Sequence, residues 1–233
     1  GTLLNVETIT GNAGADAITL ATQITGGTIN LAAGTDSLTL GNFANSATIS
    51  NVETITGNAA VDTITLATAI TAGTINLAGG TDVLTLGNFA NSATVSNTET
   101  VTGGTGIDAI TLGTTLTGMN LNLGAGADTL TLANVANTGT VSNVETITGN
   151  AAADAITLAT AITAGTIDLA AGTDSLTLAN GTNSATVSNT ETITGGTGAD
   201  TITLGSALAN TMTVDLAAGA DTLILGNFAN TGT

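Results

Sequence analysis

Residues 8–20 read TITGNAGADAITL and residues 28–40 read TINLAAGTDSLTL, two stretches that align without a gap and place an Asp at the same position. After each Asp, aliphatic residues stand at every second position, as Ile18 and Leu20 follow Asp16. Because the side chains of a β-strand point alternately to its two faces, this pattern predicts a short strand with one apolar face. Clusters of Gly and Asn between the strands predict turns.

The same stretch recurs along the whole chain with a 46-residue period. Each of the five units carries two copies, and the last unit has one inserted residue near Ala209. The Asp residues of the ten copies are Asp16, Asp36, Asp62, Asp82, Asp108, Asp128, Asp154, Asp174, Asp200 and Asp221. A fixed period of this length is typical of solenoids, in which each coil is covered only by its neighbours. We therefore expect residues 1–233 to form one all-β solenoid, a parallel β-roll of ten stacked coils in which a 20-residue coil alternates with a 26-residue coil.

The longer coil carries six additional residues in stretches such as NFANSATISNVE, residues 42–53. Phe43 stands there at a position that holds Val135 and Gly181 in other units. A position that accepts side chains of such different volume is not tightly packed. We expect this stretch to form a ridge or a lateral contact on the side opposite the Asp turns.

The charge of the chain excludes several partners. Seventeen acidic residues stand against no Lys, Arg or His, which gives a net charge of −17. Binding to nucleic acid or to anionic lipid depends on cationic side chains, so we expect neither partner. No apolar run approaches the roughly 18 residues of a membrane-spanning helix. The charge favours cations instead.

The ten Asp residues are the candidate cation ligands. If they stack one coil apart along one edge, neighbouring carboxylates repel by about 3 kcal/mol at an effective dielectric constant near 20. Calcium would relieve this repulsion, because it binds carboxylates and backbone carbonyls in flexible turns. We expect a single row of calcium ions along that edge. The alternative is that each Asp points into solvent and caps its own turn.

Two turns follow a stricter pattern, GGTGIDAIT at residues 103–111 and GGTGADTIT at residues 195–203. Both resemble the calcium-binding nonapeptide of RTX repeats, GGxGxDxUx. The resemblance implies a β-roll in which turn carbonyls and Asp carboxylates hold calcium, in proteins that bacteria export by type I secretion. It also implies a role for the turn backbone at Gly103, Gly104, Gly106, Gly195, Gly196 and Gly198.

The chain departs from the RTX pattern in two respects. An RTX coil consists of two nonapeptides with Asp turns on both edges, whereas this spacing predicts Asp turns on one edge only. In addition, Ala60 and Ala152 replace the Gly that stands two residues before Asp in the other turns, which puts calcium at those two turns in doubt. The linkage of NVETITG to DxITL also resembles bacterial surface and S-layer proteins.

A column of Glu residues repeats with the same 46-residue period: Glu7, Glu53, Glu99, Glu145 and Glu191. Copies in every second coil would lie about 9.6 Å apart, where repulsion is milder than between the Asp residues. The column is either a row of solvated corner charges or a second row of cation ligands.

Few residues in the chain could perform catalysis. Without His, Cys, Lys, Arg or Tyr, nucleophile–base pairs and oxyanion-stabilising cations are missing. Paired carboxylates could hydrolyse glycosides, but Asp168 and Asp215 replace the Asn of other units and no unit holds an acidic pair of its own. We therefore expect no enzyme.

The remaining expectations concern function and assembly. The pattern favours an extracellular or cell-surface structural protein, such as a surface fibre, an S-layer element or an adhesin stalk, stiffened by calcium. Outward Thr columns suggest an alternative, a surface that binds ice or glycan, although β-branched residues suit any outward strand position. The repeat carries no atypical terminal coil, so we expect self-association end to end or contact with further repeats of a longer array.

Overall fold

The computed structural model describes residues 1–231, which form two compact units. The N-terminal unit comprises residues 1–114 and 123–126, and the C-terminal unit comprises residues 115–122 together with the chain from residue 127 onward. Between the turns, the described residues form β-strands. They contain no helix of the length and apolarity needed to cross a membrane.

Short strands make up both units. The N-terminal unit contains β1 (Thr2–Leu3), β2 (Thr8–Asn12), β3 (Ala17–Leu20), β4 (Gly27–Ala32), β5 (Ser37–Thr39), β6 (Ser46–Ser50), β7 (Thr54–Asn58), β8 (Thr63–Leu66), β9 (Gly73–Ala78), β10 (Val83–Thr85), β11 (Ser92–Ser96), β12 (Thr100–Thr102) and β13 (Ala109–Leu112). The C-terminal unit contains β14 (Asn120–Asn122), β15 (Thr129–Thr131), β16 (Thr138–Ser142), β17 (Thr146–Asn150), β18 (Ala155–Leu158), β19 (Gly165–Ala170), β20 (Ser175–Thr177), β21 (Ser184–Ser188), β22 (Thr192–Thr194), β23 (Thr201–Leu204), β24 (Thr213–Asp215) and β25 (Thr222–Ile224).

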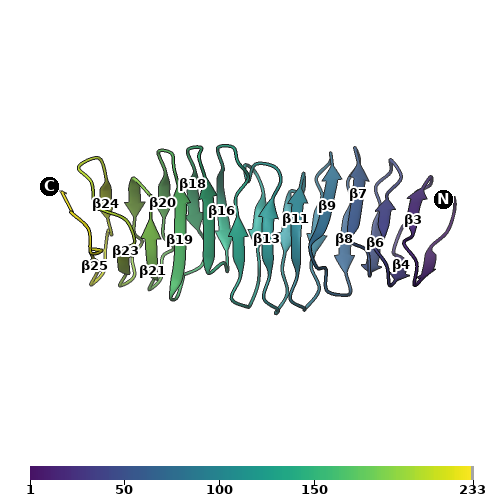
Figure 1. Cartoon of the computed structure of the whole chain (residues 1–233), viewed down its shortest axis with the longest axis horizontal. Helices are drawn as coiled ribbons and strands as arrows, with labels where there is room; N and C mark the ends of the chain where they lie inside the picture. The colour runs from purple at the N-terminus through teal and green to yellow at the C-terminus, as the bar shows by residue number, and fades with distance from the viewer. Residues whose placement is uncertain (232–233) are drawn as a thin grey trace. The chain divides into compact units, whose positions relative to one another are not determined.

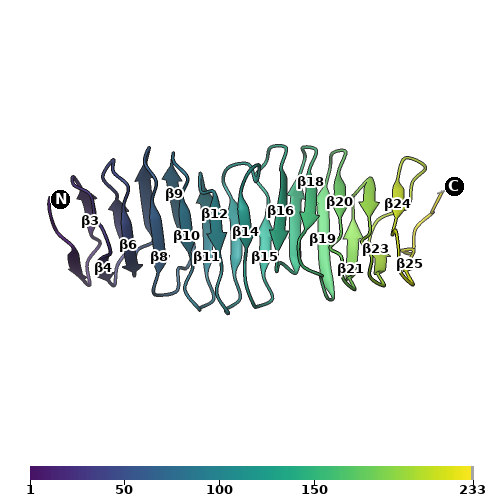
Figure 2. The ribbon, with the colours of Figure 1, turned by 180° about the vertical axis from the view of Figure 1, so that it is seen from behind.

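Consecutive strands alternate between two parallel sheets. In the N-terminal unit one sheet holds the odd-numbered strands from β1 to β13, and the other holds the even-numbered strands from β2 to β12. The C-terminal unit repeats the arrangement with β15 to β25 in one sheet and β14 to β24 in the other. Within each unit, the strands lie side by side from both viewing directions (Figures 1 and 2). The prediction of a parallel β-solenoid is confirmed.

The coils are shorter than the sequence repeat suggested. Along one sheet Ile18 pairs with Leu38, Leu38 with Ile55, and Ile55 with Ile75, so the residue number advances by 20, by 17 and by 20 again. The predicted alternation of 20-residue and 26-residue coils, and with it the division into ten coils, is therefore wrong. The strand after Asp16 is β3 and the strand after Asp62 is β8, so a 46-residue unit spans five strands, or two and a half coils.

The additional residues explain this difference. The segment SATIS forms a strand of its own, β6, in which Ala47 and Ile49 alternate inward and are 6% and 1% exposed. Apolar residues at every second position fit a strand that covers the core, so this part of the stretch is not an external ridge. Phe43, in the turn before β6, does lie at the surface and is 45% exposed.

The half-integral number of coils moves the Asp turns from edge to edge. Asp16 and Asp36 precede β3 and β5 of the odd-numbered sheet, whereas Asp62 and Asp82 precede β8 and β10 of the even-numbered sheet. The C-terminal unit alternates in the same way, since Asp154 and Asp174 precede β18 and β20, and Asp200 and Asp221 precede β23 and β25. The prediction of one Asp edge is wrong, although the two Asp residues of a pair do stack on consecutive coils.

Candidate functional site

The polar side chains at the coil edges form ladders in which each coil caps the coil before it. In the N-terminal unit, the backbone N–H of Ile24 donates to Asn45 Oδ1 at 3.2 Å, and that of Asn45 donates to Asp62 Oδ1 at 3.1 Å. The N–H of Asp62 donates to Asp82 Oδ1, and that of Asp82 to Glu99 Oε2, both at 2.7 Å. We call Asn45, Asp62, Asp82 and Glu99, and the equivalent residues of other units, a carboxylate ladder.

The same contacts recur throughout both units. They link Asp16, Asp36 and Glu53, and Asn91 and Asp108, in the N-terminal unit. In the C-terminal unit they link Asp128 and Glu145, then Asn137, Asp154, Asp174 and Glu191, then Asn183, Asp200 and Asp221. Hydrogen bonds from backbone N–H to a carboxylate are worth about 1.5–3 kcal/mol each. The ladders therefore stabilise the stacking of one coil on the next.

The inner Asp side chains of the ladders are buried. Asp62 and Asp82 are fully buried, and Asp36, Asp154 and Asp174 are 1% exposed. The alternative, in which each Asp points into solvent, is therefore wrong for these residues. A buried carboxylate has to be hydrogen-bonded to offset the loss of hydration, and the N–H group of the preceding coil supplies that bond.

The second carboxylate oxygen of these residues has a different environment. Oδ2 is buried without a hydrogen-bond partner in Asp36, Asp62, Asp82, Asp154 and Asp174. Desolvation raises the pKa of Asp62 and Asp174 and raises that of Asp82 to about 6, although backbone and side-chain donors oppose the shift. Nearby acids, such as Glu99 beside Asp82, raise the pKa further. These oxygens are therefore suited to a proton or a hard cation.

The Asn that begins the ladders after the first was not predicted as a site residue. Asn45 is 2% exposed, and its Nδ2 donates to Gly41 O at 2.9 Å, to Phe43 O at 2.6 Å and to Asp62 Oδ1 at 2.8 Å. The equivalent residues Asn91, Asn137 and Asn183 make the same three bonds. A signal was present, because in four units an Asn stands at a fixed distance before the first Asp, as Asn45 stands before Asp62.

Most members of the Glu column belong to the ladders. Glu53, Glu99, Glu145 and Glu191 are half-buried and cap the N–H groups of the Asp residues 17 positions earlier. The interpretation of these four residues as solvated corner charges is therefore wrong. Glu7 lies exposed in the first coil. A second row of cations stays a prediction.

The glycines of the two strict turns fit against neighbouring backbone. A Cβ atom on Gly103 would lie 2.7 Å from Asp108 Oδ2, and one on Gly104 would lie 2.8 Å from Gly87 O. A Cβ on Gly106 would collide with Phe89 O. Gly195, Gly196 and Gly198 meet Leu216 O, Ala179 O and Gly181 O in the same way. Close approach of two coils therefore explains the glycines of this pattern, and a role in calcium binding stays a prediction.

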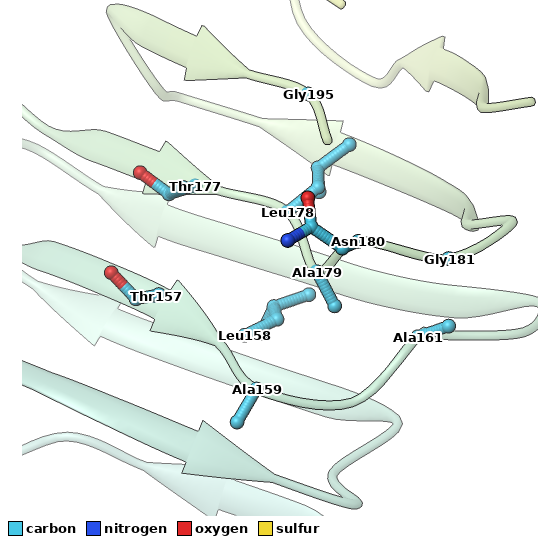
Figure 3. A pocket seen from close by; sticks show the side chains of 10 residues that line it. All are labelled: Thr157, Leu158, Ala159, Ala161, Thr177, Leu178, Ala179, Asn180, Gly181 and Gly195. Atoms are coloured by element: carbon cyan, nitrogen blue, oxygen red, sulfur yellow. The ribbon is translucent and has the colours of Figure 1, made fainter. Parts of the chain in front are cut away.

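Two of the surface hollows are copies of one another. One of about 420 Å³, between the ends of β18 and β20, is lined by Thr157, Leu158, Thr177 and Gly181 among others, and Figure 3 shows the two Thr side chains on neighbouring strands. Another hollow, of about 360 Å³, is lined by the equivalent residues two 46-residue repeats earlier, with Phe89 in place of Gly181. Neither hollow is lined by an acidic residue. They have the character of a repeated surface feature.

No group of three or more acidic side chains within residues 1–231 is placed to hold a metal ion by itself. No family model, no curated protein and no solved structure matches the chain.

Proposed function

We propose that this chain is a structural element of a bacterial-type extracellular surface, a stiff repeat solenoid that serves as part of a fibre, a surface layer or an adhesin stalk. The observation that carries the proposal is the use of the carboxylates. Nearly every ladder carboxylate holds one coil to the next, and the same contacts return in each unit. An active site would require a local exception to the repeat, whereas these carboxylates make the same coil-to-coil contacts in each repeat.

Stiffness within one unit tests this proposal. Thr8 and Thr102 lie in one column of the even-numbered sheet of the N-terminal unit, five strand steps apart. The chain has no Cys, so Thr8→Cys with Thr102→Cys carries two spin labels at defined places. We expect a narrow distance distribution centred at about 24 Å, from a strand spacing of about 4.8 Å. A broad distribution would contradict a structural role that depends on stiffness.

Calcium is part of the proposal, now in two rows because the Asp pairs alternate between edges. Its support is the buried, unpartnered Oδ2 of Asp36, Asp62 and Asp82 in a chain without cationic side chains. Backbone carbonyls lie near some pairs, since a Cβ on Gly80 would meet both Asp82 Oδ1 at 2.8 Å and Ala60 O at 2.9 Å. Carboxylate and carbonyl oxygens are the ligands that calcium prefers.

Thermal unfolding with calcium and with a chelator tests the cation. We expect calcium to raise the melting temperature of the natural sequence, because a ligand that binds only the folded state stabilises it. Asp82→Asn should reduce this increase. The matched control is Asp168→Asn, which restores the residue that Asn30, Asn76 and Asn122 carry in other units and should leave the increase unchanged. Equal melting temperatures with calcium and chelator would remove calcium from the proposal.

One observation favours a second candidate function, binding to ice. Cα partners join Thr8, Thr28, Thr48, Thr65, Thr85 and Thr102 into an unbroken outward column on the N-terminal unit. A regular row of hydroxyl and methyl groups could match a lattice that repeats along the same direction. Thermal hysteresis of the chain, and its loss in Thr48→Tyr, would support this candidate. A freezing point equal to the melting point would remove it.

A further inference from the structure

One turn of the C-terminal unit contains the only Asn–Gly pair of the sequence, Asn180–Gly181. At the equivalent position of the other repeats the Asn is followed by Phe or Val, as in Asn134–Val135. Asn180 is exposed, and both residues of the pair line the hollow of about 420 Å³ that Figure 3 shows. Solvent therefore reaches the amide of Asn180 and the backbone beside it.

The turn around Asn180 has the same backbone hydrogen bond as the turn around Asn134. The N–H of Gly181 donates to Ala179 O at 2.8 Å, and the N–H of Val135 donates to Ala133 O at 2.7 Å. Such a bond closes a three-residue turn, and a turn of this kind at the surface opens at little cost in free energy. An Ala precedes the Asn in both turns, so the residue after the Asn is what distinguishes them.

The side chain of Asn180 is free to turn toward the next backbone nitrogen. Within residues 1–231 it makes no hydrogen bond, whereas Asn42 Oδ1 in the N-terminal unit accepts the N–H of Ala59 at 3.2 Å. Gly181 has no Cβ atom, so its backbone is the least restricted and its nitrogen is the least hindered that a residue can offer. Closure of a five-membered ring between the Asn180 amide carbon and this nitrogen requires that freedom.

We propose that Asn180 is a site of spontaneous deamidation, at which the chain gains a carboxylate as it ages. The Gly181 nitrogen loses its proton to hydroxide from the solvent and attacks Asn180 Cγ, and the side-chain nitrogen leaves as ammonia. Water then opens the resulting succinimide at one of its two carbonyls. Opening at Cγ gives Asp, and opening at the main-chain carbonyl gives isoaspartate, in which the main chain runs through the side chain of residue 180.

The isoaspartate product changes a contact of the carboxylate ladder. Asn183 begins a ladder, and its Nδ2 donates to Ala179 O at 2.9 Å and to Gly181 O at 2.8 Å. These two carbonyls stand on either side of Asn180, so an additional main-chain carbon between them alters the geometry of both bonds. We therefore expect isoaspartate to weaken the contact of this turn with Asn183. Asp at the same place leaves the course of the main chain unchanged.

Peptide mass spectrometry after incubation at mildly alkaline pH tests the site. A protease that cleaves after Glu releases residues 146–191, which contain Asn180, and residues 100–145, which contain Asn134. We expect the mass change from amide to acid at Asn180, assigned by fragmentation, and none at Asn134 over the same time. Gly181→Val recreates the sequence after Asn134 and should slow the change at Asn180 by about tenfold or more, because a Cβ atom hinders ring closure. No change at Asn180, or equal rates at the two Asn residues, would overturn the proposal.

A second measurement identifies the product and its effect. Protein isoaspartate methyltransferase, which labels isoaspartate and not Asp, should label the incubated natural sequence and leave incubated Gly181→Val unlabelled. The labelled fraction should unfold at a lower urea concentration than Asn180→Asp, which carries the same charge on an unchanged main chain. Absence of label would contradict the succinimide route, and equal urea midpoints would contradict the weakened contact with Asn183.

Discussion

The two units share their ladders and differ in the turns beside them. In the N-terminal unit Phe43 and Phe89 occupy the exposed turn position, whereas the C-terminal unit has Val135 and Gly181 in its first two copies and Phe228 in its last. The residue two positions earlier changes with it. Gly41, Gly87 and Gly226 precede the three Phe residues, whereas Ala133 and Ala179 precede Val135 and Gly181. The turn surface therefore varies in correlated pairs while the ladder beneath it stays constant.

The correlation has a steric cause. A Cβ on Gly87 would lie 2.8 Å from Phe89 Cδ2, and one on Gly41 would lie 3.1 Å from Phe43 Cδ2. The aromatic ring folds back across the glycine, so an Ala at that place excludes it. One coil later Val61 and Ile107 follow the two Phe residues, whereas Ala153 and Ala199 stand at these positions in the C-terminal unit. The comparison shows that the repeat can replace the apolar cluster at a turn while the hydrogen bonds of the carboxylate ladder stay the same.

The largest expected effect concerns the shared ladder and should be equal in the two units. Asn91→Ala and Asn183→Ala each remove the acceptor of the N–H of Ile70 or Ile162 and the side-chain donor to two backbone carbonyls. One of these carbonyls, Gly87 O or Ala179 O, keeps the N–H of the residue two positions later. Since each buried unsatisfied group costs about 1–3 kcal/mol, we expect a loss of about 3 kcal/mol or more in the free energy of unfolding, measured by urea denaturation. The control is Asn180→Ala at an exposed position. If only one of the two variants lost much of its free energy of unfolding, the ladders would not contribute equally to the two units.

The second largest loss of stability is expected at the turn position where the two units differ. Gly87→Ala should destabilise the N-terminal unit by about 1–3 kcal/mol, because the new methyl group overlaps the Phe89 ring. The double variant Gly87→Ala with Phe89→Gly recreates the Ala179 and Gly181 pair and should recover most of the loss. A double-mutant cycle from urea denaturation gives the coupling. Additive losses would show that the two residues vary independently.

Sequence alone predicted the parts of this fold that depend on local alternation. Strict period-two placement of Ile and Leu after each Asp predicted parallel stacked strands, and residues such as Leu38, Ile55 and Ile75 are fully buried as expected. The predicted coil length was wrong because the sequence period gives the number of residues in a repeat but not the number of coils that those residues form. A 46-residue unit closes after two and a half coils, so successive units present the same turn on opposite edges. The alternation of Ala47 and Ile49 was the signal for the additional strand.

The candidate site was harder to predict because its chemistry depends on neighbours in space. Acidic residues in a chain without cations suggest solvent or metal, and only the structure shows that Asp82 Oδ1 accepts the N–H of Asp62 from the preceding coil. The same holds for Asn45, whose three donated bonds join one turn to the next coil. Spacing identified the residues of the Asp and Glu columns, but it could not identify their partners.

A third prediction concerns pH. The folded-state pKa of Asp82 is about 6, above its usual 3.8, and those of Asp62 and Asp174 are also raised. Between about pH 4 and 6 the folded chain therefore holds more protons than the unfolded chain, so stability falls as pH rises through this range. In the absence of metal ions we expect the melting temperature to decrease by a few degrees from pH 4 to pH 7.

A matched pair of variants separates the two units in this measurement. Asp82→Asn keeps an acceptor for the N–H of Asp62 and should flatten the pH dependence in the N-terminal unit, as Asp174→Asn should in the C-terminal unit. Asp168→Asn, which changes an acid on the outer face, should leave the dependence unchanged. A melting temperature that does not change from pH 4 to pH 7 would show that the ladder carboxylates ionise as easily in the folded chain as in the unfolded chain, and one that rises would show that they ionise more easily when folded.

The smallest expected effect lies at a backbone position that the two units share. Ala78 and Ala170 both end long strands with φ near +70°, a left-handed conformation that is unfavourable for a residue with a Cβ atom. Replacement of either by Gly should raise the free energy of unfolding by about 0.5–1 kcal/mol, since relief of this strain exceeds the entropy that Gly loses on folding. Ala59→Gly, in a turn without positive φ, is the control and should be neutral or slightly destabilising. An equal increase in the free energy of unfolding at Ala78 and Ala170 would show that the two units differ in their turn surfaces and not in their backbone. A decrease at both positions would mean that contacts of the Ala side chain outweigh the backbone strain.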